Sequence, residues 1–297
     1  MKKILYRHRG NELLSEEKVP SELAIRLLYS SFFTRPLLKL VVTRFLSSYY
    51  GRLMSSRKSC QKIARFIEDY AIDINESLKG LDEFTSFNDF FTRKLKQTAR
   101  PINCSASNIV SPADGKILVY QNVNDSPYFC IKGDQYTFRS LLNDDTLAER
   151  YMNCSLAIIR LAPTDYHRFH FPLAGKVSAT REVTGKYYSV SPIALRSIPS
   201  IFTLNKRTIC EIMCTDTGSY LYLEIGATMV GSIVQTYTAD SLINKGDEKG
   251  YFEFGGSTVI VAFPQGSVRF DSDLLENTLA GYETKVQMGE RIAEIEL

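Results

Sequence analysis

Apolar residues follow two different spacings along the chain. From residue 21 to 54, and again from 60 to 98, they recur at the period of an α-helix. From Asn108 onward they fall in short β-branched and aromatic runs separated by Gly, Pro, Asn and Asp, as in strands joined by turns. The pattern predicts an α+β protein, with amphipathic helices first and a mostly antiparallel β domain after them.

The change of texture at Pro101 suggests two parts, a helical region of residues 1–100 and a β-rich domain of residues 101–297. Residues 282–295 have the pattern of a hairpin in a lipoyl-like half-barrel. The other expected strands lie at residues 116–120, 155–161, 176–183, 208–214, 220–225, 232–237, 258–263 and 291–296.

The first sixty residues are both basic and apolar. They hold twelve Lys/Arg against four Asp/Glu, whereas the whole chain has a formal charge of only +3. No uncharged run of the roughly 18 residues that a spanning helix needs is left, because cations interrupt the apolar stretch at Arg26, Arg35, Lys39, Arg44 and Arg52. We expect this segment to lie on an anionic phospholipid membrane, to cap the protein's own core, or to do both.

Targeting and cysteine patterns are consistent with this picture. Arg7, His8 and Arg9 interrupt the apolar core that a secretion signal would need, so no such signal is predicted. The six cysteines show no CxxC spacing and there are only three histidines, so no metal site is expected. The apolar content of the basic region favours lipid over nucleic acid. The sequence therefore predicts a peripheral protein on the cytoplasmic side of the cell membrane.

Four short segments carry side chains suited to chemistry. Residues 111–115 (SPADG) have the composition of a tight turn, and residues 164–170 (TDYHRFH) gather two of the three histidines. Residues 226–233 (GATMVGSI) offer glycines where backbone can approach a reacting group. Residues 254–258 (FGGST) place a serine behind two glycines. Each segment alone is also typical of an ordinary turn.

Ser257 is positioned to attack the peptide bond that precedes it. Gly256 has no Cβ, so the backbone can adopt a strained geometry and its carbonyl is open to the Ser257 hydroxyl. A serine nucleophile needs a general base, and that base needs an orienting carboxylate. His170 and Asp114 can fill these roles, because a neutral imidazole accepts a proton near pH 7. A plain Gly-Gly turn before a strand is the alternative.

In this order, the four segments resemble the motifs of the phosphatidylserine decarboxylase family, which are an SPxDG turn, a DYHRxH loop, a GAxxVGSI stretch and a (G/L)GST site. The resemblance begins at residues 90–93 (FFTR), which match the family's FFxR, and continues to the C-terminus. Residues 185–196 match a further substrate-side element. The GGST site is a subgroup pattern. Ser191 and Lys206 depart from the family, whose members often have Asn and Glu there.

The resemblance implies a self-processing enzyme. Ser257, deprotonated by His170 with Asp114 holding the imidazole, attacks the Gly256 carbonyl and converts the amide to an ester. Elimination then cuts the chain between residues 256 and 257. Water hydrolyses the resulting dehydroalanine, through its imine form, and releases ammonia, so Ser257 becomes a covalent pyruvoyl group, which is the cofactor.

The resemblance also implies the reaction. Phosphatidylserine forms a Schiff base with the pyruvoyl group, which accepts the electrons released with carbon dioxide, and phosphatidylethanolamine is the product. His167 is the implied acid/base of decarboxylation, and Asp165 the implied support of His170. The two cleavage products, residues 1–256 and 257–297, are expected to stay together as a heterodimer that could dimerise further.

Three rival functions stay open at this point. A pyruvoyl decarboxylase of a soluble amino acid would keep its activity without residues 1–60. A membrane-binding relative that is never processed would remain one intact chain. A metal-dependent hydrolase using His167, His170 and Asp165 would be sensitive to chelators and would survive Ser257→Ala, although these residues supply too few donors for a closed site.

Overall fold

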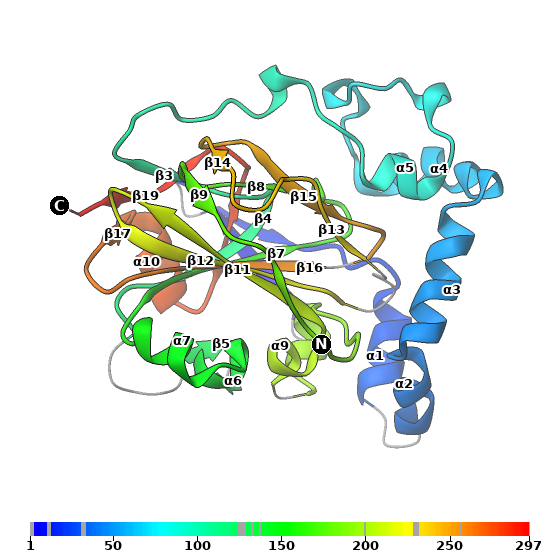
Figure 1. Cartoon of the computed structure of the whole chain (residues 1–297). Helices are drawn as coiled ribbons and strands as arrows, with labels where there is room; N and C mark the ends of the chain where they lie inside the picture. Colours follow the sequence, from blue (N-terminus) through cyan, green and yellow to red (C-terminus); the bar gives the residue numbers. More distant parts are fainter. Residues whose placement is uncertain are drawn as a thin grey trace.

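A large, mostly antiparallel sheet forms the centre of the protein (Figure 1). The computed structural model describes residues 3–10, 13–30, 34–123, 129–131, 134–136, 138–198, 200–227, 232–255 and 257–296. Within these residues the sheet has eleven strands. Ten of them follow one another in the order β14 (Leu242–Ile243), β9 (Gly175–Val177), β11 (Arg207–Cys214), β12 (Gly218–Ile225), β16 (Ser257–Phe263), β7 (Ser155–Leu161), β4 (Gly115–Tyr120), β18 (Glu283–Val286), β1 (Leu5–His8) and β2 (Leu14–Glu16). The eleventh, β10 (Arg181–Val183), also pairs with β11. The expected α+β class is confirmed.

Both faces of this sheet are buried, so its central strands are apolar on both sides. In β16, Val259, Val261 and Phe263 belong to one core, whereas Ile260 and Ala262 belong to the other. Two small sheets cover the first face. One consists of β13 (Ile233–Gln235), β15 (Glu248–Phe252) and β8 (Arg168–His170). The other consists of β17 (Val268–Phe270), β19 (Arg291–Ile295) and β3 (Asn108–Val110).

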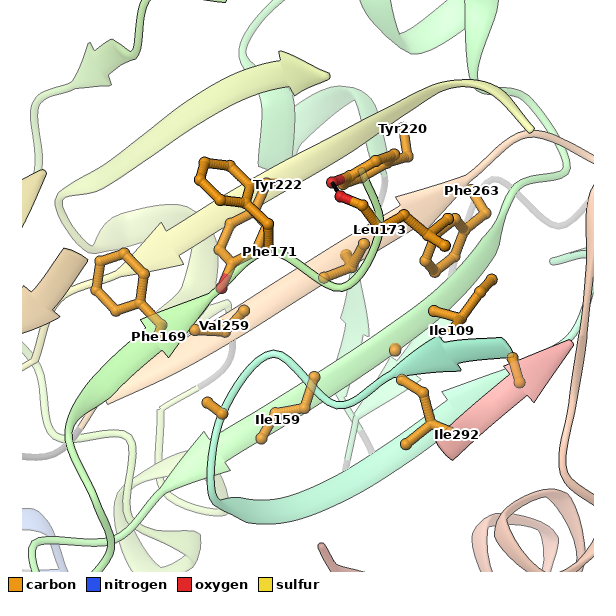
Figure 2. Close-up of a cluster of buried hydrophobic side chains, with 14 of the residues drawn as sticks. Ile109, Ile159, Phe169, Phe171, Leu173, Tyr220, Tyr222, Val259, Phe263 and Ile292 are labelled. Carbon is orange, nitrogen blue, oxygen red and sulfur yellow. Dashed lines mark hydrogen bonds between the residues drawn. The ribbon is translucent and has the colours of Figure 1, made fainter. Parts of the chain in front are cut away.

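Aromatic side chains fill much of the first core (Figure 2). Phe169 and Phe171 lie over Tyr222 of β12 and Val259 of β16. The Tyr222 hydroxyl donates to the His170 backbone carbonyl at 3.2 Å. The strand that carries His170 is thus packed and hydrogen-bonded onto β12, the strand next to that of Ser257.

Short helices cover the second face of the sheet (Figure 1). They are α6 (Phe138–Leu142), α7 (Asp145–Arg150), α8 (Pro192–Leu195) and α9 (Ile201–Leu204). The hairpin of β5 (Phe129–Ile131) and β6 (Asp134–Tyr136) stands apart from the large sheet, and α10 (Ser272–Leu279) packs on β4 and β18.

A group of helices from the first hundred residues stands at one side of the sheet (Figure 1). Among the described residues, three 3-10 turns and one longer 3-10 segment connect them. The elements are α1 (Glu22–Ser30), α2 (Arg35–Val41), α3 (Arg44–Met54), η2 (Arg57–Lys62), α4 (Ile63–Tyr70), η3 (Ile74–Glu76), η4 (Leu81–Glu83), α5 (Phe87–Phe91) and η5 (Gln97–Ala99). Among the helices described, none is long and apolar enough to cross a membrane.

The helices α3 to α5 enclose a third core, which reaches the chain just before Ser257. Phe87, Phe90 and Phe91 of α5 are buried there, and Phe254 packs against them. The Phe254 ring lies 5.0 Å from that of Phe91, and its backbone N–H donates to Asn88 Oδ1 at 2.9 Å. The helical region thus holds the segment that leads into the predicted cleavage site.

Two segments near the N-terminus differ from the expected helical region, because Leu5–His8 and Leu14–Glu16 are strands. β1 pairs in parallel with β18, and β2 pairs antiparallel with β1. Without β1, the backbone groups along that edge of β18 would lack partners in the sheet, and strand pairing satisfies them. Part of the region predicted as helical therefore extends the central sheet.

The hairpin predicted at residues 282–295 is also wrong. β18 enters the large sheet beside β4, whereas β19 pairs with β3 and β17. Gly289, with φ of +89°, lies in the turn between them, and a Cβ there would come within 2.6 Å of the Pro101 carbonyl oxygen. The turn needs glycine because it redirects the chain from one sheet to another.

Candidate active site

Ser257 is the first residue of β16 and is fully buried. It pairs with Leu161 of β7 and, by alternation, its side chain shares a face with Val259 and Val261, the face that β8 and β15 cover. Within the described part of the chain its Oγ has no hydrogen-bond partner. A buried hydroxyl without a partner costs about 1–3 kcal/mol, so its presence calls for a functional explanation. Gly256 lies outside the described residues.

His167 lies in the loop between β7 and β8 and keeps a free proton-accepting nitrogen. Its Nδ1 is 2.9 Å from the Asp165 backbone oxygen. Because a carbonyl only accepts, Nδ1 carries the hydrogen and Nε2 the lone pair. Nε2 is buried with no partner among the described residues. Burial lowers the pKa of His167 to about 4, so the imidazole is neutral at pH 7.

The surroundings of His167 connect it to the predicted cleavage site. Its ring centroid lies 3.9 Å from that of Phe91. The Gly255 backbone is close enough to raise its pKa slightly against the larger effect of burial. A neutral imidazole with an open acceptor thus sits beside the chain two residues before Ser257.

His170 is held at both ring nitrogens. Its Nδ1 lies 3.0 Å from the Gly246 backbone oxygen, and its Nε2 lies 3.4 Å from the Tyr166 hydroxyl, which is a long hydrogen bond. Its backbone N–H donates to the Pro112 carbonyl at 2.7 Å, which joins the two predicted motifs. Burial lowers the pKa of His170 as well, so both loop histidines are neutral near pH 7.

Asp114 is held by an arginine and makes no hydrogen bond to His170 among the described contacts. Its carboxylate accepts from Arg100 Nε and Nη2 at 2.9 and 2.7 Å, and from the Met288 backbone N–H at 2.8 Å. Charge-assisted bonds of this two-pronged kind are strong, so they leave little reason for the carboxylate to turn toward the imidazole. The Asp114 charge is still close enough to raise the pKa of His170 against burial.

Asp165 does not support His170. Its carboxylate accepts from Lys116 Nζ at 2.9 Å and from the Ala162 backbone N–H at 2.8 Å. Its charge also raises the pKa of His167 against the larger effect of burial. Its backbone oxygen fixes the tautomer of His167.

The sequence analysis did not predict a buried ion pair that lies beside the site. Lys249 of β15 and Glu224 of β12 are both fully buried, with Nζ and Oε1 2.5 Å apart. Thr208 Oγ1 donates to Glu224 Oε2 at 2.6 Å, and Lys249 Nζ donates to Gln235 Oε1 at 2.8 Å. The sequence does contain one indication of it. Glu224 follows Tyr220 and Tyr222 at every second position of an apolar strand, so its side chain lies on the same buried face as theirs.

The remaining motif segments are only partly visible. Residues 228–231 of the predicted 226–233 stretch lie outside the described residues, while the Gly226 carbonyl accepts from Asn205 at 2.8 Å. The two departures from the family pattern have structural partners. The Ser191 hydroxyl caps α8 by accepting from the Ala194 N–H at 3.3 Å, and Lys206 pairs with Glu182 at 2.9 Å.

Comparisons with known proteins agree with this arrangement. The family model for phosphatidylserine decarboxylase matches residues 87–294. Proteins named phosphatidylserine decarboxylase proenzyme are 46% identical over 98% of this chain in Clostridium tetani, 46% identical over 97% in Fusobacterium nucleatum, and 42% identical over 96% in Clostridium beijerinckii. The match covers 98%, 97% and 97% of those proteins, respectively. Over almost its whole length, therefore, the chain belongs to the phosphatidylserine decarboxylase family.

Proposed function

We propose that this protein is a pyruvoyl-dependent enzyme that decarboxylates phosphatidylserine to phosphatidylethanolamine after cutting its own chain before Ser257. The observation that carries the proposal is the pair of unpartnered buried atoms, Ser257 Oγ and His167 Nε2, at the GGST site. Relatives of nearly the same length that carry the name proenzyme support it.

The chain's own groups suit the cutting step. Ser257 Oγ attacks the Gly256 carbonyl, and a neutral imidazole accepts the hydroxyl proton. We assign this base to His170, with Asp114 acting through its charge rather than through a hydrogen bond. His167 then serves the decarboxylation, because its Nε2 stays free once the chain is cut. The pyruvoyl group supplies an electron sink for the bond to the departing carbon dioxide.

The N-terminal helices are proposed to rest on an anionic membrane at the cytoplasmic face. Leu23, Leu27, Leu40 and Phe45 are between 58% and 82% exposed, which is unusual for apolar side chains unless they meet a partner. The other face of the same helices packs on the body, where the Val42 carbonyl accepts from the Tyr187 N–H. Amphipathic helices that both cap the core and face lipid fit these contacts.

Three further proposals follow from the same assignment. The two products, residues 1–256 and 257–297, form the working heterodimer. The helical region 1–100 serves membrane association, and residues 101–297 serve catalysis, although β1 and β2 belong to the sheet of the latter. The lipoyl-like half-barrel character of the β domain stays a prediction.

Purified protein incubated with mixed micelles of phosphatidylserine should release carbon dioxide and form phosphatidylethanolamine. A soluble serine analogue without acyl chains should react far more slowly. Reduction with cyanoborohydride in the presence of substrate should add the mass of the lipid to the short chain that begins at residue 257. Equal rates with free serine and with lipid would favour the rival amino-acid decarboxylase.

The two histidines should separate cutting from decarboxylation. His170→Ala is expected to slow the appearance of two chains by roughly 10²–10⁴-fold, the usual contribution of a general base. His167→Ala should still be cut, because its role begins afterwards, but should lose decarboxylation by a similar factor. Denaturing gels followed over time measure the first effect, and product formation by the cut fraction measures the second. The opposite pattern would exchange the two assignments.

A further inference from the structure

Arg93 is a buried arginine that forms no ion pair with the residues that the structure describes. Four arginines are buried among the described residues, and three have full sets of acceptors. Arg100 binds Asp114 and Glu76, Arg160 binds Glu17 and Glu283, and Arg207 donates to the carbonyls of Ser140, Leu141, Thr203 and Asn205. Arg93 is only 7% exposed, yet within the described part of the chain its Nε has no partner and its Nη1 makes one long contact, 3.4 Å, to the Phe90 carbonyl.

A buried cation of this kind destabilises the folded protein. Taking a charge out of water costs several kcal/mol unless an anion or a set of acceptors replaces the water. The guanidinium lies 4.9 Å from the centroid of the Phe90 ring, which compensates only in part. Burial lowers the pKa of Arg93 and outweighs the charges of Asp114 and Glu76, which raise it from a distance without a direct bond to the guanidinium among the described contacts. The free protein thus holds a cation that an incoming anion would stabilise.

The position of Arg93 connects it to the reacting groups. It follows α5 directly, and Phe91 of α5 packs on His167 and on Phe254. The Arg93 charge also lowers the pKa of His167. The preceding carbonyl, of Thr92, accepts from Arg168 at 2.8 Å, which fixes the backbone here to the histidine loop.

The lipid-facing helices lie on the other side of the same core. α5 packs against α3, whose Phe45 and Tyr49 are 82% and 55% exposed. A lipid whose acyl chains rest against α3 would hold its headgroup near α5, because the two helices pack on each other. The headgroup carries the anions that Arg93 lacks.

We infer that Arg93 binds an oxyanion of the phosphoserine headgroup, an assignment that rests on the proposed function. A guanidinium can hold either candidate, the serine carboxylate or the phosphate, through two parallel N–H bonds. Phosphatidylethanolamine keeps the phosphate and has lost the carboxylate. Competition by this product therefore tells the two oxyanions apart.

The test compares Arg93→Met and Arg93→Lys with Arg207→Lys, a buried arginine on the far side of the sheet. For each variant, denaturing gels give the cut fraction, and mixed micelles at fixed detergent give the half-saturating mole fraction of phosphatidylserine. Arg93→Met should raise this value about 10–100-fold, since a hydrogen bond to a charged group is worth about 1.5–3 kcal/mol. Arg93→Lys should give a half-saturating mole fraction between those of the wild type and Arg93→Met. Arg207→Lys should lower the thermal stability and leave the half-saturating mole fraction unchanged.

Product inhibition completes the design. Inhibition by phosphatidylethanolamine that is unchanged in Arg93→Met assigns the carboxylate, and inhibition weakened by the same factor assigns the phosphate. Half-saturation within twofold of wild type would overturn the inference, as would folded Arg93 variants that are never cut, which would give Arg93 a role in cleavage. A wild-type protein without activity would instead refute the proposed function.

Discussion

Ser257→Ala is expected to remain a single chain of 297 residues, whereas the wild type separates on denaturation into residues 1–256 and 257–297. The substitution removes the attacking oxygen and with it the source of the pyruvoyl group, so decarboxylation should fall below detection. The fold should survive, because the lost hydroxyl has no partner and its removal relieves an unsatisfied buried group. Intact mass and a thermal melt measure both effects.

Thr258→Val is the matched control for this experiment. Thr258 is the next residue of β16, is fully buried, and also carries a hydroxyl without a described partner. By the alternation of the strand it faces the second core, away from the histidines. It should therefore be cut like the wild type. Two chains from Ser257→Ala, or one from Thr258→Val, would place the reactive group elsewhere.

Lys249→Met is expected to cost about 3–5 kcal/mol of unfolding free energy, the usual effect of removing one partner from a buried ion pair. The Glu224 carboxylate would stay fully buried with the Thr208 hydroxyl as its remaining side-chain donor. Urea unfolding should be measured on the Ser257→Ala background, because a two-chain protein does not unfold in a single two-state step.

A double-mutant cycle separates the pair from simple packing. Glu224→Leu alone leaves the Lys249 ammonium buried without its carboxylate partner. The double variant, Lys249→Met with Glu224→Leu, removes both charges of the pair. The double variant should lose less stability than either single variant, since an apolar replacement of a buried pair is often close to neutral. Additive losses would mean that the two charges do not stabilise each other.

The central strands could be predicted because each is apolar on both faces. The runs at 116–120, 155–161, 220–225 and 258–263 correspond to β4, β7, β12 and β16. The N-terminal strands could not be predicted in this way. Leu5–His8 contains two basic residues, and its partner β18 lies some 280 residues away. Pairing at the end of a sheet, rather than local pattern, decides their conformation.

The site was foreseen in its residues more than in its contacts. The Gly255 backbone, two residues before Ser257, acts on the pKa of His167, but the hydrogen-bond partners of Asp114 and Asp165 are cations from other elements. Arg100 and Lys116 stand in segments that gave no chemical signal. Which of two nearby groups a carboxylate chooses depends on three-dimensional geometry that spacing along the chain does not contain.

The order of strands in the central sheet determines how long the two fragments would stay associated after cleavage. Residues 257–297 provide β16, which lies between β12 and β7, and β18, which lies between β4 and β1. They also provide β19, which lies between β3 and β17. Every flanking strand except β17 comes from the other fragment, so the small fragment can leave only if the sheet opens at several seams. Its off-rate should then equal the rate of global unfolding, and dilution alone should never separate the fragments.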